Sequence, residues 1–282
     1  MNDAMILSGV SKRYGDFQLD GVNLRLERGS IMGFIGENGA GKSTTIHAIL
    51  GLIRPDGGEI TLLGERGGEH AQRELRERLG VVLDEACFPE LLCLRDVRSI
   101  VSKLYRSWDE RRFSELCERF ALPERKQIKE YSKGMKTKLM IAVALSHATE
   151  LLILDEATSG LDPIVRDEVL ELFLEFTADP NHAIFMSSHI LSDLEKACDY
   201  IAFLHRGRLM FCEPKDELIE KFAVLKCSKE EFVKLDRSRI YGSRENRFGV
   251  EALVKREEFR GTGLLLDPAS IEDIMLYTGK ER

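Results

Sequence analysis

The sequence predicts an α/β fold with a mostly parallel core sheet, an N-terminal antiparallel β subdomain, a helical insert and a small C-terminal extension. Three observations lead to this fold class. Short apolar segments alternate with segments of helical spacing from about residue 30 to residue 200. A glycine-rich segment joins one apolar segment to a helical one, and a later apolar segment ends in two carboxylates. Strands that alternate with helices imply a parallel sheet with right-handed connections.

The glycine-rich segment, residues 36–44, fills the pattern G-x-x-x-x-G-K-[ST] of a phosphate-binding loop. Residues 30–35 before it are typical of a buried strand and residues 42–50 after it of a helix, so the context disfavours a chance glycine-rich turn. Glycines let successive backbone N–H groups point at phosphate oxygens, lysine adds a positive charge, and a serine hydroxyl can bind Mg²⁺. The segment therefore predicts a P-loop NTPase. The expected nucleotide-contacting residues are Gly36, Asn38, Gly39, Ala40, Gly41, Lys42, Ser43 and Thr44, with Ser43 also a Mg²⁺ ligand.

The remaining segments complete the expected architecture. Residues 5–28 alternate apolar and polar positions around Gly-Asp and Asp-Gly turns, which favours antiparallel strands. Residues from about 85 to 150 form a mainly helical insert, broken at Pro123. The other expected elements are helices at 71–79, 167–176, 192–197 and 270–277, strands at 59–63, 79–83, 151–154 and 183–186, and a hairpin of 200–204 with 208–211. A boundary after residue 221 divides a large domain, 1–221, from a small α+β extension, 222–282, whose role the sequence leaves open.

Composition narrows the class of protein. The 282 residues are 43% hydrophobic, enough for a sizeable core, and the net charge of −7 argues against a protein that wraps around nucleic acid. The six cysteines form no C-x-x-C pair, so we expect reduced thiols and a cytosolic protein. We expect no signal peptide, and the longest apolar stretch, residues 141–154, is too short and too polar to span a bilayer. Another chain must then supply any membrane-spanning part.

Two carboxylates follow the apolar strand at 151–154. Asp155, at the end of this strand, can hold Mg²⁺ directly or through water. Glu156 is then placed to orient or deprotonate a water molecule for in-line attack on the γ-phosphate. An apolar strand followed by Asp-Glu has little weight by itself, because surface turns often have this form. Together with the phosphate loop it predicts a site that hydrolyses a nucleotide.

A serine-led helix start lies between the phosphate loop and these carboxylates. The segment Tyr131-Ser-Lys-Gly-Met-Lys136 opens a helix that runs to about His147, and Ser132 can cap it and leave N–H groups for an anion. Here the chain resembles the ATP-binding subunits of ATP-binding-cassette (ABC) transporters, whose signature motif Leu-Ser-Gly-Gly-Gln aligns with residues 131–135. The resemblance covers residues 1 to about 220, with several motifs in the family's order. The Tyr-Ser-Lys-Gly-Met variant and the ending at 268–275 look like bacterial single-cassette subunits that pair with separate exporter-type permeases.

The resemblance implies a dimer with ATP and Mg²⁺ as cofactors. In the family, two cassettes enclose two ATP molecules, each held by the phosphate loop of one subunit and the signature helix of the other. The residues that would meet the partner's ATP are Ser132, Gly134 and Met135, and Ser159-Gly-Leu-Asp162 matches the loop that crosses the dimer interface. The sequence leaves open whether the partner cassette is an identical chain or a different one.

Individual residues also acquire roles through the resemblance. Tyr14 stands where the family stacks an aromatic ring on adenine, and His189 stands where a histidine touches the γ-phosphate. The implied catalytic residues are Glu156, His189 and Lys42. The other histidines match nothing in the family pattern, and we expect them to have a structural role or to lie on the surface: His47, His70, His147, His182 and His205.

Two departures from the family pattern stand out. Asp84, followed by Glu85, occupies the position of a glutamine that reaches Mg²⁺ and the attacking water. An acid there can bind the metal, which makes Asp84 a third candidate ligand, or it can be protonated through repulsion from nearby carboxylates. Lys133 and Met135 replace glycine and glutamine of the signature motif, and a lysine near the partner's phosphate can offset a strained backbone.

The leading hypothesis is an ATP-hydrolysing subunit, cytoplasmic and peripheral on the inner face of the cell membrane, that drives export through a separate permease. The helical insert would dock the permease, with Phe88, Leu91, Leu92, Leu94 and Tyr105 as candidate contacts. Two alternatives remain: a soluble ABC-type ATPase that acts on ribosomes or nucleic acid, and a regulatory protein that binds ATP without turnover. The acidic balance, the single cassette and the absence of sustained heptads speak against a nucleic-acid partner.

Overall fold

The structure, a computed structural model, describes residues 2–84 and 88–279 and divides into two compact units, Met1–Phe211 and Cys212–Arg282. The division lies earlier than the expected boundary after residue 221. The reason is helix α8 (Lys215–Lys221), which contacts strand β11 (Phe222–Cys227) and the short turn η4 (Arg256–Phe259) and so folds with the second unit. Glu85 and Cys87 lie outside the described residues.

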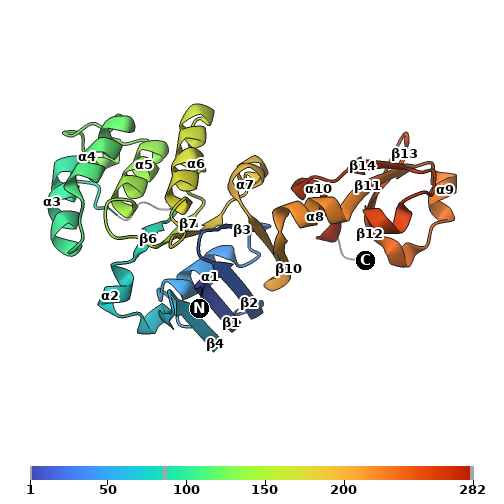
Figure 1. The fold of residues 1–282 in the computed structure, drawn as a ribbon, viewed down its shortest axis with the longest axis horizontal. Coiled ribbons are helices and arrows are strands. Elements are labelled where there is room, and N and C mark those ends of the chain that lie inside the picture. The colour runs from blue at the N-terminus through green and yellow to red at the C-terminus, as the bar shows by residue number, and fades with distance from the viewer. Residues whose placement is uncertain (1, 85–87, 280–282) are drawn as a thin grey trace. The chain divides into compact units, whose positions relative to one another are not determined.

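The first unit is built on a six-stranded sheet with the order β10-β9-β3-β8-β7-β6 (Figure 1). Its strands are β3 (Ile31–Gly36), β6 (Leu79–Val82), β7 (Leu151–Asp155), β8 (Ala183–Ser187), β9 (Tyr200–His205) and β10 (Arg208–Pro214). The pairs β9–β3, β3–β8, β8–β7 and β7–β6 are parallel. Every residue of β3, β7 and β8 is buried, as expected for central strands covered on both faces. The predicted mostly parallel sheet is confirmed.

A second sheet of the first unit is antiparallel, with the order β2-β1-β4-β5. Its strands are β1 (Asp3–Tyr14), β2 (Phe17–Glu27), β4 (Gly57–Leu62) and β5 (Glu65–Arg66). A tight turn joins β1 to β2, because Tyr14 pairs with Phe17 and Gly15 takes the left-handed conformation with φ +51°. The predicted antiparallel β subdomain is confirmed, and it places the end of β1 at Tyr14.

Helices connect the strands of the first unit (Figure 1). They are α1 (Lys42–Ile49), α2 (Arg73–Arg76), α3 (Leu94–Leu104), α4 (Glu110–Arg119), α5 (Lys133–Ala144), α6 (Pro163–Thr177) and α7 (Leu191–Ala197). Pro123 lies after the end of α4, as the predicted break requires. Helix α2 is shorter than the expected 71–79, because Leu79 already belongs to β6 and the short turn η1 (Gly68–His70) precedes it.

Helix α5 is also shorter than expected at its carboxyl end. The predicted helix ran to about His147, whereas α5 ends at Ala144. Polar side chains close this end: Ser146 Oγ donates to the carbonyl of Ala142 at 2.6 Å, and Thr149 Oγ1 donates to the carbonyl of Ala144 at 2.5 Å. These bonds satisfy carbonyls that lack an intrahelical partner and turn the chain into β7.

The second unit is a four-stranded antiparallel sheet with the order β12-β13-β11-β14. Its other strands are β12 (Ile240–Asn246), β13 (Gly249–Lys255) and β14 (Leu265–Pro268), and its other helices are α9 (Lys229–Val233) and α10 (Ile271–Thr278). Ser270 and Asp273 form the capping box predicted for α10: the serine hydroxyl accepts from Asp273 N and the aspartate accepts from Ser270 N. A core that includes Leu225, Ala252 and Val254 stabilises the unit.

Among residues 2–84 and 88–279, none of the helices is both long and apolar enough to cross a lipid bilayer.

Glu150, just before β7, pairs with two arginines from other segments of the first unit, Arg28 and Arg78. Its carboxylate accepts from Arg78 Nε at 2.6 Å and from Arg28 Nη1 at 2.9 Å, and Arg78 also pairs with Glu65. These guanidinium groups lower the pKa of Glu150 to about 2, with the hydrogen bond from Arg78 as the largest cause. Because the folded pKa lies below the unfolded value of about 4.3, the carboxylate stabilises the fold above that value. The contribution is lost as the pH falls toward 2.

We predict that Glu150→Gln lowers the free energy of unfolding by about 1–2 kcal/mol at pH 7, the range for a partly buried charge-assisted contact. The difference between the variant and the unaltered protein should shrink as the pH falls from 5 toward 2, as measured by urea unfolding followed by circular dichroism. Glu65→Gln is the matched control, because this more exposed carboxylate bonds to the same Arg78 and should change stability by less than about 0.5 kcal/mol. A pH-independent difference for Glu150→Gln would contradict the assignment.

Candidate functional site

The phosphate loop connects the end of β3 to the start of α1. Gly36 ends β3 and must lack a side chain, because a Cβ there would lie 2.4 Å from the carbonyl oxygen of Leu204 in β9. Gly39 and Gly41 have φ values of +80° and +110°, a conformation that favours glycine. Gly41 is the N-cap of α1 and no side chain bonds to the helix start. The first N–H groups of α1 are therefore available to an anion.

Lys42, the first residue of α1, bends back over the loop. Its side chain is buried, and Nζ donates to the carbonyl of Gly36 at 2.7 Å and to that of Glu37 at 3.3 Å. These bonds hold a positive charge beside the exposed loop residues 37–39. Ser43 is exposed and Thr44 half-buried. The predicted nucleotide-contacting residues thus lie together in the loop between β3 and α1 and in the first turn of α1, and their contacts with a nucleotide stay a prediction.

Asp155 and Glu156 lie at the carboxyl end of the sheet. Asp155 is buried at the last position of β7, directly opposite Ser187 of β8, and its Oδ1 accepts from Ser187 Oγ at 2.6 Å. The same hydroxyl oxygen accepts from the backbone N–H of Glu156 at 3.1 Å. Glu156 takes a left-handed conformation with φ +54°, which is uncommon for a residue with a side chain. Ser187 therefore orients both Asp155 and Glu156. The sequence patterns had not identified this serine as a functional residue.

His189 lies against Glu156. Its Nδ1 is 2.5 Å from Glu156 Oε2, and its backbone N–H donates to the same oxygen at 3.3 Å. The glutamate side chain is 18% exposed and the histidine side chain 58% exposed. Because a carboxylate only accepts hydrogen bonds, Nδ1 carries the proton in this contact. The structure brings together two residues that were predicted separately, one from strand position and one from resemblance.

The serine-led turn at the start of α5 is accessible from outside the chain. Ser132 caps the helix by accepting from Met135 N at 3.2 Å, and both Ser132 and Lys133 are exposed. Gly134 packs closely on the loop after β7, where a Cβ would lie 3.2 Å from the carbonyl oxygen of Gly160. Asp162 ends that loop by capping α6, since its carboxylate accepts from Val165 N at 3.1 Å. The predicted signature turn and the predicted interface loop are therefore neighbours in one chain.

Asp84 has a cationic partner that was not expected. Its Oδ1 lies 2.6 Å from Nζ of Lys133. Sequence reasoning compared Asp84 with Asp155 and Glu156, and Lys133 with a partner's phosphate, but not these two residues with each other. One feature of the sequence could have indicated this pairing: Asp84 and Lys133 both depart from the family pattern, and their charges are opposite. The described contact of Asp84 is thus with the signature turn, and its role as a metal ligand stays a prediction.

Tyr14 lies at the edge of the β subdomain. Its ring is 47% exposed, and Lys12 Nζ lies 5.3 Å from the ring centroid. Phe17, which pairs with Tyr14, reaches the phosphate loop, because a Cβ on Gly41 would lie 2.7 Å from its Cζ. Tyr14 remains a prediction as the adenine-stacking residue. Phe17 is an aromatic residue beside the loop that sequence reasoning overlooked.

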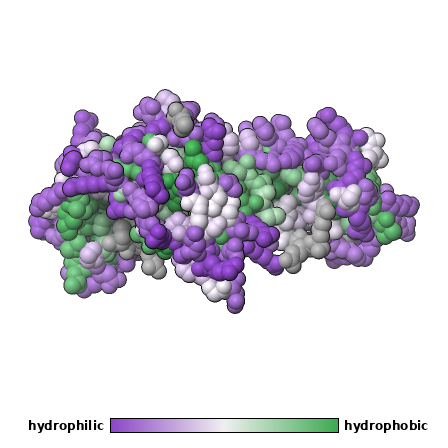
Figure 2. Space-filling model, turned by 90° about the horizontal axis from the view of Figure 1, so that it is seen from below, coloured by the Kyte–Doolittle hydropathy of each residue, from purple (hydrophilic) through white to green (hydrophobic). Residues whose placement is uncertain are grey.

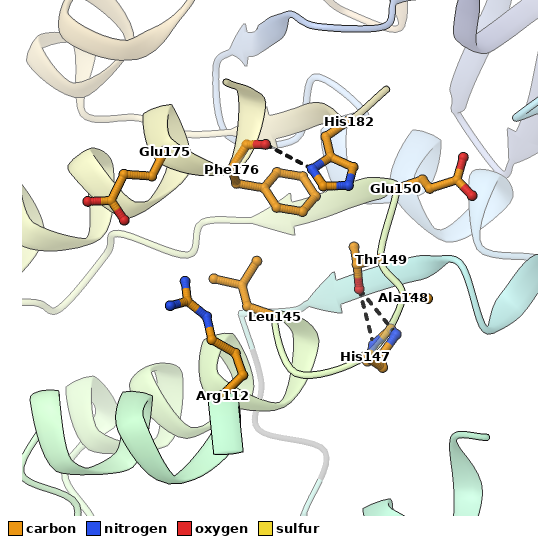
Figure 3. A pocket seen from close by; sticks show the side chains of 9 residues that line it. All are labelled: Arg112, Leu145, His147, Ala148, Thr149, Glu150, Glu175, Phe176 and His182. Atoms are coloured by element: carbon orange, nitrogen blue, oxygen red, sulfur yellow. Dashed lines mark hydrogen bonds between the residues drawn. The ribbon is translucent and has the colours of Figure 1, made fainter. Parts of the chain in front are cut away.

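Two other histidines line a separate cavity of about 320 Å³ (Figure 3). His147 stacks on Tyr105 with ring centroids 3.9 Å apart, and burial lowers the pKa of this histidine to about 4. His182 stacks on Phe176 with centroids 4.3 Å apart, and its Nδ1 lies 2.9 Å from the carbonyl oxygen of Phe176. Aromatic and backbone contacts thus engage both rings, which suits the structural role expected for them.

Comparisons with known proteins agree on one family. A sequence profile of the family described as ABC transporter matches residues 19–159. The bacitracin transport ATP-binding protein BcrA of Bacillus licheniformis is 37% identical over 221 residues, which are 77% of this chain and 72% of the relative. The Nod factor export ATP-binding protein I of Rhizobium sp. (strain N33) is 33% identical over 300 residues, covering 99% of this chain and 98% of the relative. The second alignment therefore includes the second unit.

A solved structure agrees with the same fold. The structure of an ATP-binding subunit of an ABC transporter superposes with a TM-score of 0.70 and 31% identity, covering 76% of this chain and 91% of that one. The predicted fold class of a P-loop NTPase with a mostly parallel sheet is confirmed by this likeness.

We predict that Ser187→Ala weakens the site without unfolding it. Loss of the hydroxyl group frees the Asp155 carboxylate and removes one acceptor for Glu156 N, so the Mg²⁺ concentration for half-maximal ATP hydrolysis should rise by roughly tenfold, the size of one charge-assisted hydrogen bond. Ser188→Ala is the control: the Ser188 hydroxyl accepts from Ile190 N, so its loss should leave the Mg²⁺ dependence unchanged. Equal Mg²⁺ curves for both variants would refute the role of Ser187.

Proposed function

This chain belongs to the ABC transporter family as an ATP-binding, ATP-hydrolysing subunit, and from this premise we propose that it drives export through a separate membrane permease. The Rhizobium relative is named for the export of Nod factor, and the Bacillus relative is named for the transport of bacitracin. We propose the same direction of transport and a location on the cytoplasmic face of the cell membrane. The cargo would be chosen by the permease.

The observation that carries the proposal is the presence of two complementary half-sites on one chain. One half-site consists of the phosphate loop with Lys42, Asp155, Glu156 and His189. The other is the exposed turn at Ser132, whose backbone donors begin a twelve-residue helix. An isologous dimer lets each turn meet a triphosphate held by the other chain. A sister cassette in place of a second copy would serve the same geometry.

The residues at the sheet edge fit a Mg²⁺ ion. Asp155 offers a carboxylate whose direction is set by Ser187, and Ser43 offers an exposed hydroxyl group, both of them the oxygen ligands that Mg²⁺ prefers. When bound, the ion neutralises charge that develops on the β- and γ-phosphates. Lys42 and the backbone N–H groups of residues 41–44 would bind the same phosphates from the side of the loop.

Glu156 and His189 would divide the work on the attacking water. Glu156 accepts a proton from the water as it attacks the γ-phosphate in line with the leaving group. His189 donates through Nδ1 to Glu156 and so holds the glutamate in place. This arrangement favours turnover over a purely regulatory protein, because both groups have defined partners.

The helical insert offers an apolar surface for the permease. Three exposed side chains on and before α3 are Leu91 (71% exposed), Ile100 (44%) and Leu104 (57%). Figure 2 shows apolar side chains at the left edge, on the side where Figure 1 has α3 and α4. Such side chains on a monomer are candidates for an interface. Of the contacts predicted from sequence, Leu91 suits this role.

Other predicted permease contacts do not suit it. Leu94 is 1% exposed and belongs to the core of the insert, so its prediction was wrong. The ring of Tyr105 stacks on His147, and Phe88 and Leu92 are half-buried. Leu94 points inward because it shares one buried helix face with Val97 and Val101. The exposed face, with Ile100 and Leu104, is the better candidate.

We predict that Glu156→Gln lowers ATP hydrolysis by about a hundredfold or more while ATP binding is preserved, because the amide keeps the shape but cannot accept the proton. In the presence of ATP, a closed dimer of the variant should then accumulate. Analytical ultracentrifugation with Mg²⁺ and ATP measures this dimer. His189→Ala should reduce hydrolysis less, since it removes the contact that orients Glu156 but not the base. Unaltered steady-state hydrolysis in Glu156→Gln would contradict the role of this residue.

A further inference from the structure

Two of the residues that depart from the family pattern, Asp84 and Lys133, form an ion pair with each other. Asp84 follows β6 at the carboxyl edge of the parallel sheet, and Lys133 is the first residue of α5. The ammonium Nζ lies 2.6 Å from Asp84 Oδ1, although the residues are 49 positions apart in the chain. The Lys133 and Asp84 side chains are 52% and 48% exposed. The pair thus joins the edge of the core sheet to the tip of the signature helix.

The aliphatic part of Lys133 is held as well. An ideal Cβ on Gly160 would lie 3.3 Å from Cδ of Lys133, so the absence of a side chain at Gly160 leaves room for the lysine stem. The stem therefore rests on the loop after β7 while the ammonium group meets Asp84. These two contacts define where the positive charge lies. The first turn of α5 contains no acidic residue that would compete for it.

The ion pair is suited to positioning rather than to stability. Exposed ion pairs contribute little to the free energy of folding, because water screens both charges. An ammonium group has three donors, and the contact with Asp84 uses one of them. The others can bind phosphate oxygens without breaking the pair. A carboxylate behind the lysine also fixes the direction of a side chain that otherwise has many rotamers.

We propose that Lys133 binds the terminal phosphate of the nucleotide held by the opposing cassette and that Asp84 positions it for this contact. The inference rests on the proposed function, since it requires that the turn at Ser132 meets a partner's triphosphate. In this proposal Asp84 acts by positioning Lys133 and is not a direct ligand of Mg²⁺. It also accounts for the joint appearance of an acid and a base at positions where the family pattern has neither.

The test measures ATP-dependent dimerisation in the Glu156→Gln background, where hydrolysis does not deplete the dimer. The probe is Mg²⁺ with ATP, and the readouts are the dimer dissociation constant from analytical ultracentrifugation and its dependence on salt. Lys133→Gly, which restores the family residue, should raise the dimer dissociation constant by about tenfold or more, the expected size for the loss of one charge-assisted hydrogen bond. The same substitution should make the dissociation constant less dependent on salt. Lys133→Arg should retain most of the affinity. Lys136→Gln, on the same helix, is the control for loss of a positive charge.

A double-mutant cycle separates positioning from metal binding by Asp84. Asp84→Asn alone should weaken the dimer by about threefold to tenfold, and it should have no further effect once Lys133 is glycine, because the two residues act as a unit. ATP affinity of the monomer and its Mg²⁺ dependence should not change in Asp84→Asn. If Asp84 binds the metal directly, its substitution raises the Mg²⁺ requirement of the monomer and still acts in the Lys133→Gly background, which would overturn the proposal.

Failure of this inference differs from failure of the proposed function. If Glu156→Gln dimerises with ATP and Lys133→Gly behaves like Lys136→Gln, the role of Lys133 is refuted while the cassette dimer stands. If Glu156→Gln itself shows no ATP-dependent dimer, the proposed function and this inference fall together. Retention of circular dichroism and monomer ATP binding in Lys133→Gly excludes misfolding as the reason for a weaker dimer.

Discussion

The parallel register of β7 and β8 is the constraint on which the site depends. It places Asp155 opposite Ser187, at the last position of two strands that are buried on both faces. A buried carboxylate needs a hydrogen-bond partner, and the serine hydroxyl is the one the neighbouring strand provides. The same register brings the N–H of Glu156 to Ser187 and leads the chain on to His189. A one-residue change of register would separate all of these groups.

Three acidic groups of the first unit each have a hydrogen-bond donor beside them. Asp155 meets a hydroxyl group, Glu156 an imidazole and Asp84 an ammonium group. Repulsion among carboxylates, which sequence reasoning raised as a problem for Asp84, is thereby reduced at each position by a local partner. The partners differ in exposure, because Ser187 is buried in a strand while the Lys133 side chain is 52% exposed at a helix start. The site therefore has a buried part at the sheet edge and an exposed part at the start of α5.

Local patterns predicted most of the elements. The strand–loop–helix unit at residues 30–50 needed only the glycine spacing and an apolar run, and the capping box at Ser270 followed from two residues. Predictions went wrong where side-chain contacts and packing decide the end of an element or the burial of a residue. Helix α5 ends early because Ser146 and Thr149 bond back to it, and Leu94 is buried because the inner face of α3 packs into the insert. The second unit begins before residue 221 because α8 packs on β11.

By itself, the sequence determined the fold class and the position of the phosphate loop, because both depend on residues close together in the chain, and it predicted Lys42, Asp155, Glu156 and His189 as functional residues. Only the tertiary structure decided which of them meet. The contacts of Ser187 with Asp155, of His189 with Glu156 and of Lys133 with Asp84 join residues 32, 33 and 49 positions apart. Such pairs arise from strand register and helix placement, which no local spacing encodes, so their chemistry became visible only once the chain was folded.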